Sequence, residues 1–208
     1  MYVCQKFVQK TTEMEQHFNF NNELSGKIAL VTGGTKGAGK AIAERLLAAG
    51  ATVIITARNP PENPNDKIHF IAADLATSIG TKKVVDEVVS KFGKLDILVN
   101  NLGGSDTKGG GFAVLNEEDW LQTLQSNLLA PVRLDSGFLP QMITQKSGVI
   151  IHIASIQGKL PLYDSTLPYA AAKAGLKAGD IIIQLGDNAV SSVEAYMQAL
   201  NKFNKGDK

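Results

Sequence analysis

The chain has 208 residues, of which 44% are hydrophobic and 20% are charged, and its formal net charge is +1. This length favours one domain with a sizeable core, and the near-neutral charge gives no electrostatic basis for binding nucleic acid or an anionic membrane surface. The single cysteine, Cys4, excludes an intrachain disulfide and fits a reducing cytoplasm, where we expect the protein to reside. We find neither an apolar run of roughly 20 residues, as a membrane helix needs, nor a secretory signal.

Residues 1–23 are polar, with scattered aromatic side chains among Gln, Asn, Glu and Lys. We predict a loosely ordered tail, and a short helix docked on the body is the alternative. The tail is the first of three predicted segments. The others are residues 24–176, which carry a regular pattern, and residues 177–208.

Short apolar runs and helical patterns alternate five times from residue 27 onward. The predicted strands are residues 27–32, 51–56, 68–72, 95–100 and 148–154. The predicted helices are residues 40–49, residues 81–92, residues 117–142 with breaks near Pro131 and Pro140, and a helix that begins at residue 169. This alternation is typical of an α/β fold with a parallel sheet that is covered on both faces. In such sheets, ligands bind beyond the carboxyl ends of the strands.

A glycine-rich segment, residues 32–39 (TGGTKGAG), joins the first strand to the first helix. Glycines permit a tight turn and let the backbone approach a pyrophosphate, and a helix N-terminus offers free N–H groups to it. The flanking strand and helix give the segment the context of a dinucleotide-binding loop. A packing turn without a ligand is the alternative.

The glycine spacing resembles that of the short-chain dehydrogenase/reductase family, and the resemblance extends over about residues 24–176. The stretch Asn100-Asn101-Leu102-Gly103 resembles the family's N-N-A-G motif, with Leu102 in place of the usual Ala. The remaining matches are Asp74 after the third strand, Asn127, Ser155, Tyr169 and Lys173. The resemblance implies a Rossmann-like, doubly wound parallel sheet, here truncated at its C-terminal end.

The end of the second strand bears on the choice of nucleotide. A carboxylate there would bind the ribose 2′-hydroxyl of NAD, whereas this chain has Thr56-Ala57-Arg58. Arg58 can pair with a 2′-phosphate, and Lys36 adds a second cation, so we predict NADP rather than NAD. The alternative is that both are solvated surface charges. The expected cofactor-binding residues are Thr32, Gly33, Thr35, Lys36, Gly37, Gly39, Arg58, Asp74, Leu75, Asn101, Gly103, Tyr169 and Lys173.

Tyr169 and Lys173 are four residues apart, which places both side chains on one face of a helix. A nearby ammonium favours the phenolate of a tyrosine, whose ordinary pKa is about 10, and suits it to exchange a proton with a carbonyl or alcohol oxygen. Ser155 can donate a hydrogen bond to that oxygen. By resemblance, Lys173 also binds the nicotinamide ribose and Asn127 holds a water for proton relay. We therefore expect an NADP-dependent oxidoreductase that interconverts a small-molecule carbonyl and alcohol.

Several other residues have a structural interpretation. His152 alternates with apolar neighbours and Trp120 lies at helical spacing from Leu124, so we predict both in the core. Leu160, Leu162 and Tyr163 either line a substrate pocket or pack within a loop. No Cys, His and carboxylate cluster has the spacing of metal ligands, so we expect no metal.

The family resemblance ends after Leu176. Residues 174–208, with the stretch G-L-K-A-G-D-I-I and a helix opened by Ser191 or Ser192, resemble the latter part of a bacterial PDZ domain. We predict a short PDZ-like strand–turn–helix tail fused to the sheet, in which residues 180–185 add a sixth strand or residues 180–190 form a hairpin. Two other functions stay open: a catalytically impaired nucleotide-binding remnant and a protein-interaction module. Apolar surface left bare by the missing elements favours self-association, and the family commonly forms homo-oligomers.

Overall fold

A five-stranded parallel sheet forms the centre of the computed structural model, which describes residues 22–105, 107–164, 166–178, 184–185 and 188–189. The strands are β1 (Ile28–Thr32), β2 (Thr52–Ala57), β3 (Ile68–Ala72), β4 (Ile97–Asn100) and β5 (Val149–His152). All five lie within one or two residues of the predicted positions. The predicted Rossmann-like parallel sheet is therefore confirmed for this part of the chain.

The strand order is β3-β2-β1-β4-β5, and every neighbouring pair is parallel. The chain runs outward from β1 to β3, then returns to place β4 on the other side of β1. The loops that follow β1 and β4 therefore diverge from adjacent strands at the carboxyl edge of the sheet. In open sheets of this kind, that switch point is where ligands bind.

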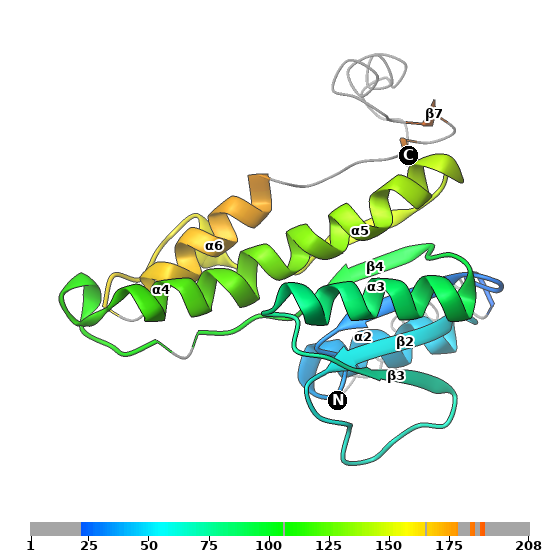
Figure 1. The fold of residues 1–208 in the computed structure, drawn as a ribbon, viewed down its shortest axis with the longest axis horizontal. Helices are drawn as coiled ribbons and strands as arrows, with labels where there is room; N and C mark the ends of the chain where they lie inside the picture. Colours follow the sequence, from blue (N-terminus) through cyan, green and yellow to red (C-terminus); the bar gives the residue numbers. More distant parts are fainter. Residues whose placement is uncertain (1–21, 106, 165, 179–183, 186–187, 190–208) are drawn as a thin grey trace, which may run out of the picture.

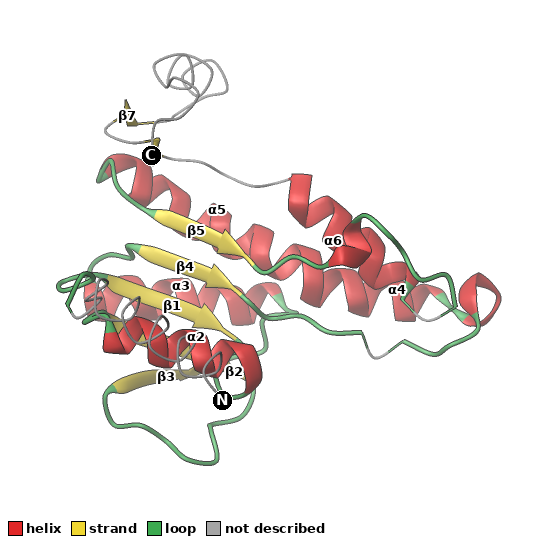
Figure 2. Ribbon diagram, turned by 180° about the vertical axis from the view of Figure 1, so that it is seen from behind, coloured by secondary structure: helices red, strands yellow, loops and turns green. Residues whose placement is uncertain are grey.

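Helices cover both faces of the sheet, and each face has its own apolar cluster (Figures 1 and 2). On one face, α2 (Gly37–Ala48) packs Ala43 and Leu46 against the β1 and β2 side chains. On the other face, α3 (Ser78–Phe92) and α5 (Ala130–Thr144) pack against alternate residues of the same strands. The strands are buried on both sides, which explains why they are nearly continuous apolar runs.

Two helices begin three residues before their predicted starts. Helix α2 begins at Gly37, so Gly37 and Gly39 of the glycine-rich loop also form part of its first turn. Helix α3 begins at Ser78 and is capped by the side chain of Thr77, which accepts a hydrogen bond from the Gly80 backbone at 3.0 Å. Glycine, serine and threonine favour loops and caps, so the sequence pattern alone placed these first turns outside the helices.

The long predicted helix consists of α4 (Glu117–Leu124), a π-helical turn (Gln125–Leu129) and α5. The predicted break near Pro131 coincides with this π-helical turn, but the helical conformation continues through it, and Pro131 is the second residue of α5. The predicted break at Pro140 is wrong, because α5 continues through it. Pro140 is exposed, so water can solvate the carbonyl that loses its partner.

Helix α6 (Leu167–Ala178) packs against α4 and the π-helical turn. Beyond it, β6 (Gln184–Leu185) pairs antiparallel with β7 (Asn188–Ala189), which agrees with the hairpin alternative and not with a sixth strand of the main sheet. Residues 1–21 of the N-terminal tail and most of the PDZ-like segment lie outside the described residues, so the PDZ-like resemblance stays a prediction.

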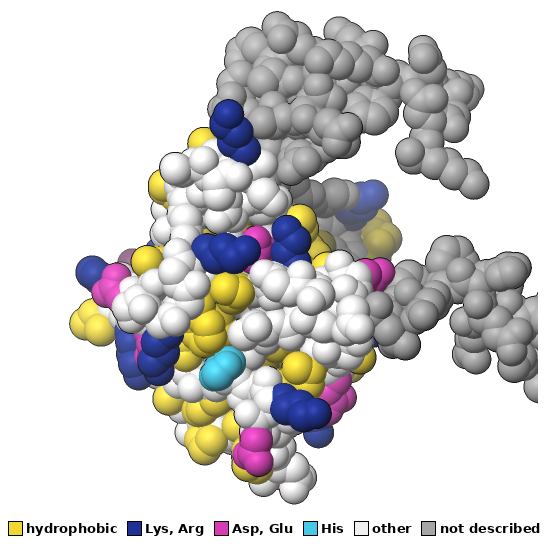
Figure 3. Space-filling view, turned by 90° about the vertical axis from the view of Figure 1, so that its right-hand side faces the viewer, with side chains coloured by type: hydrophobic (Ala, Val, Ile, Leu, Met, Phe, Trp, Pro, Cys, Tyr) yellow, Lys and Arg dark blue, Asp and Glu magenta, His cyan; other side chains and the backbone are white. Residues whose placement is uncertain are grey.

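Asp96 is the residue before β4, and its side chain connects the amino ends of β1 and β4. Its carboxylate accepts a hydrogen bond from the Ile28 backbone at 2.9 Å and pairs with Lys94 and Lys27 at 2.9 and 3.8 Å. Figure 3 shows this end of the molecule, where basic and acidic side chains are interspersed. Among the described helices, none is long and apolar enough to cross a membrane.

Candidate active site

The glycine-rich loop packs too closely for side chains at several positions. Gly33 and Gly37 have φ values of +64° and +56°, which L-residues rarely adopt. A Cβ on Gly39 would lie 2.3 Å from the Gly33 carbonyl oxygen and 2.5 Å from the Asn101 amide nitrogen. The space beside Gly37 is open, and no side chain caps the N-terminus of α2. This arrangement leaves the first backbone N–H groups of α2 available to an anionic ligand.

Thr32 and Asn101 connect this loop to the loop after β4. The buried Thr32 hydroxyl accepts hydrogen bonds from the backbone N–H groups of Asn101 and Leu102, both at 2.9 Å. In return, the Asn101 amide donates to the Thr32 carbonyl at 2.9 Å. The Thr32 side chain is therefore committed to shaping the site, and a cofactor would meet its backbone.

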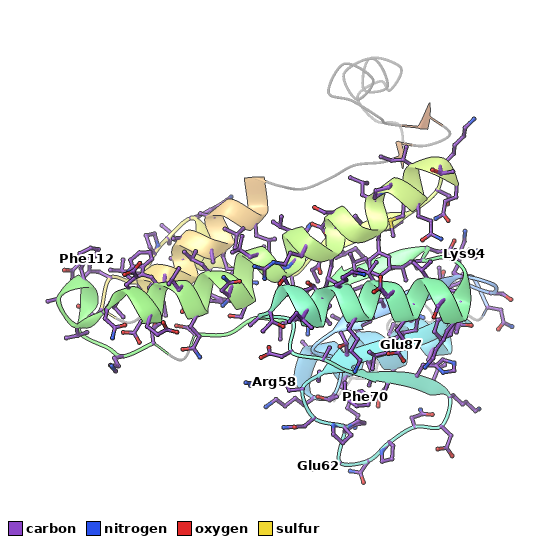
Figure 4. All side chains as sticks on the ribbon, in the orientation of Figure 1. Arg58, Glu62, Phe70, Glu87, Lys94 and Phe112 are labelled. Carbon is purple, nitrogen blue, oxygen red and sulfur yellow. The ribbon has the colours of Figure 1, made fainter. Side chains whose placement is uncertain are left out.

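The predicted cofactor residues on the outer strands lie along the same edge of the sheet. Arg58 follows β2 and extends into solvent, as Figure 4 shows, and Lys36 is also exposed. Asp74 follows β3, and its carboxylate accepts a hydrogen bond from the Ala76 backbone at 3.1 Å. The Leu75 side chain is buried in the core, so only its backbone faces the site. Thr35 is partly buried within the loop itself.

Asn127 lies in the π-helical turn and is fully buried. Its amide donates to the Gly104 carbonyl and its oxygen accepts from the Gly104 N–H, both at 2.9 Å. A π-helical turn is frequent at functional sites because it redirects one side chain. Here it directs Asn127 to the loop after β4.

Lys173 is nearly fully buried on α6, and its ammonium donates to the Ile153 carbonyl at 2.8 Å. Burial lowers the pKa of this lysine below its ordinary value. The ammonium lies 5.6 Å from the centre of the Tyr169 ring. A Cβ on Gly103 would lie 3.2 Å from the same ammonium and 2.7 Å from the Asn127 oxygen. The fold thus gathers Gly103, Asn127, Tyr169 and Lys173 in one place.

Ser155 lies three residues beyond the end of β5. Its hydroxyl oxygen accepts a hydrogen bond from the Gln157 backbone at 3.2 Å and so caps η3 (Ile156–Gly158). The hydroxyl proton is not used in that bond, so Ser155 can still donate to a ligand. Helix α6 packs against η3, and a Cβ on Gly158 would lie 3.0 Å from the Lys173 carbonyl.

A buried polar cluster behind the site was not anticipated from the sequence. The Asp135 carboxylate accepts a hydrogen bond from the Asn100 amide at 2.8 Å and lies 3.4 Å from the His152 ring. The predicted burial of His152 is confirmed, but its partner comes from α5. Trp120, predicted in the core, is only partly buried and meets Phe112 edge to face. No spacing signal links Asp135 to the two strand ends that it joins.

Residues 27–179 match the short chain dehydrogenase family over most of the chain. The chain belongs to this family. It is 36% identical over 162 residues to an uncharacterized oxidoreductase, YvrD, of Bacillus subtilis, and 36% identical over 159 residues to the 3-oxoacyl-[acyl-carrier-protein] reductase FabG of Salmonella typhimurium. These alignments each cover 74% of this chain, and 60% and 64% of the respective relatives. The chain therefore spans about three fifths of the length of these relatives.

Solved structures support the same relationship. A metagenomic short-chain oxidoreductase in complex with NADP superposes with a TM-score of 0.67 at 35% identity, covering 74% of this chain and 73% of that one. A short-chain dehydrogenase from Streptomyces avermitilis gives a TM-score of 0.67 at 34% identity, covering 75% of this chain and 58% of that one.

Proposed function

We propose that this chain binds NADP and interconverts a carbonyl and an alcohol. The observation that carries this proposal is the gathering of Tyr169, Lys173 and Asn127 around Gly103, at the switch point of the sheet. The chain's relatives include a structure in complex with NADP, which supports the choice of cofactor.

The glycine-rich loop fits a pyrophosphate, because close packing at Gly39 and the open space beside Gly37 bring the backbone and the α2 N-terminus to the ligand. Lys36 and Arg58 would hold the 2′-phosphate, and the first turn of α2 carries no acidic residue that would repel it. The backbone of Thr32, Gly33, Thr35, Leu75 and Asn101, together with Asp74, would complete the nucleotide site.

The catalytic residues have separate roles. Bound NADPH would supply the hydride. The Tyr169 hydroxyl donates a proton to the carbonyl oxygen during reduction and takes it back during oxidation. Ser155 donates a hydrogen bond to the same oxygen as negative charge develops on it. Lys173 and Asn127 hold the loops from β4 and β5 in place, and Lys173 supplies positive charge beside the Tyr169 ring.

Titration of NADPH and NADH by cofactor fluorescence, followed by NADPH oxidation with a panel of ketones, tests the proposal. We expect NADPH to bind at least tenfold more tightly than NADH. We expect Arg58→Ala to remove most of that preference.

Tyr169→Phe should bind NADPH normally and lose at least a hundredfold in turnover, the contribution typical of general acid catalysis. Absence of NADPH binding would refute the proposal.

A second candidate function is nucleotide binding without turnover. NADPH binding with no oxidation by any ketone, in wild type and Tyr169→Phe alike, would support this second function instead.

A further inference from the structure

Large exposed apolar side chains are concentrated beside the candidate site. Thirteen such side chains are exposed among the described residues, and six of them lie in the two segments that follow β4 and β5. We call these six the apolar rim: Phe112, Val114, Ile156, Leu160, Leu162 and Tyr163. The other seven are distributed over α3, α4, α5 and β5. A cluster of this kind marks a binding surface more often than scattered exposure does.

The two segments of the rim are held together by specific contacts. The N–H groups of Gly110 and Gly111 donate to the Asp164 carbonyl at 2.6 and 3.4 Å. The Tyr163 ring packs so closely on Gly111 that a Cβ there would lie 2.4 Å from it. Figure 4 shows Phe112 at the end of the molecule beyond α4. The rim is thus a built surface formed by residues far apart in the chain.

The rim is continuous with the catalytic residues. Ile156 directly follows Ser155, and η3, which contains Ile156, packs against α6. At the other end of the segment, the Thr166 N–H donates to the Leu162 carbonyl at 3.2 Å, and the Ala170 N–H donates to the Thr166 carbonyl at 2.8 Å. These bonds lead from the rim into the turn of α6 that carries Tyr169.

We propose that the substrate of this chain is a carbonyl or alcohol compound with a large apolar group, which lies on the apolar rim while its oxygen faces Ser155 and Tyr169. This inference rests on the proposed function. A polyhydroxylated substrate would leave its hydroxyl groups facing leucine and isoleucine side chains without partners, which is unfavourable. An apolar group instead removes both surfaces from water, at about 25 cal/mol per Å² of apolar area.

The chain contains one tryptophan, Trp120, and its ring lies 6.2 Å from that of Phe112. Ligands on the rim should therefore change the tryptophan emission. We would titrate methyl ketones from butanone to undecan-2-one into the full chain with saturating NADP⁺, a ternary complex in which no hydride is available. Each added methylene should tighten binding two- to four-fold, as roughly 0.8 kcal/mol per buried CH₂ implies.

Leu160→Ser and Leu162→Ser should reduce this dependence on chain length while leaving NADPH binding unchanged. Ile79→Ser is the matched control, because Ile79 is an exposed isoleucine on α3, away from the rim. Equal affinity for all ketones in a chain that binds NADPH would overturn the inference and leave the proposed function standing. The inference would also be overturned if the rim variants change the molecular mass measured by sedimentation but leave ketone affinity unchanged. That result would indicate that a second copy of the chain binds to the rim. Absence of NADPH binding would instead refute the proposed function.

Discussion

Asp135 is a carboxyl group buried between the ends of two strands. Burial raises its pKa, while the nearby His152 and the hydrogen bond from Asn100 act in the opposite direction without overcoming it. Because the folded protein binds this proton more tightly than the unfolded chain, the resulting stabilisation is complete below the unfolded pKa of about 3.9. It is lost as the pH rises through the folded pKa.

Replacing this carboxyl by an amide should therefore stabilise the protein at neutral pH. Asp135→Asn keeps an acceptor for Asn100 and offers a donor to His152, and it removes the buried charge. We expect the variant to gain on the order of 1 kcal/mol in the free energy of unfolding at pH 7.5, and little at pH 4. Urea unfolding at both pH values measures this. Asp86→Asn, at an exposed carboxylate, is the control and should show no such change with pH. A gain that is equal at both pH values would contradict the explanation.

At the scale of elements, the packing of α2 on the glycine-rich loop depends on Gly39. A Cβ there would meet the Gly33 carbonyl and the Asn101 amide. We expect Gly39→Ala to weaken NADPH binding at least tenfold and to lower the melting temperature, because the loop must shift away from both atoms. Fluorescence titration and thermal unfolding measure these effects.

Gly175→Ala is the matched control, because it also replaces a helical glycine. Its Cβ would meet only Leu128 at an ordinary contact distance of 3.4 Å, so the variant should keep NADPH affinity. It should also gain roughly 0.5–1 kcal/mol in stability from the better helix propensity of alanine. Wild-type NADPH affinity in Gly39→Ala would show that the loop does not bind the cofactor as proposed.

Signals local to a few residues predicted most of the elements. Strands β1 to β5 are short apolar runs between polar turns, and the glycine spacing before α2 is a local pattern as well. Tyr169 and Lys173 are four residues apart, so helical geometry alone brings them together. The family resemblance then placed Ser155 and Asn127 with them.

Contacts between distant residues could not be predicted in this way. The Asp135 cluster joins α5 to two strand ends, and the rim depends on bonds from Gly110 and Gly111 to Asp164. Neither has a fixed sequence spacing. The continuation of α5 through Pro140 depends on that residue being exposed, which the helical pattern of the sequence does not determine.

At the scale of the whole molecule, β5 is the outermost strand of the main sheet and has a described neighbour on one side only. Val149 and Ile151 project from one of its faces and are 49% and 43% exposed. Figure 2 shows β5 at the border of the sheet, beyond the part of the sheet that α2 covers. A β-branched edge strand with an uncovered face is a site at which sheets associate.

We therefore predict that the chain self-associates through β5 in a concentration-dependent manner. Ile151→Lys places a charge on the exposed face of this strand, which opposes pairing with a second sheet without filling the core. We expect sedimentation velocity to show larger species for the wild type at tens of micromolar and mainly monomer for Ile151→Lys. Val89→Lys tests whether any added lysine has this effect, because Val89 is 41% exposed on α3, which packs on the opposite face of the sheet. If Val89→Lys dissociates the larger species equally well, general surface charge controls the association, and the β5 edge does not.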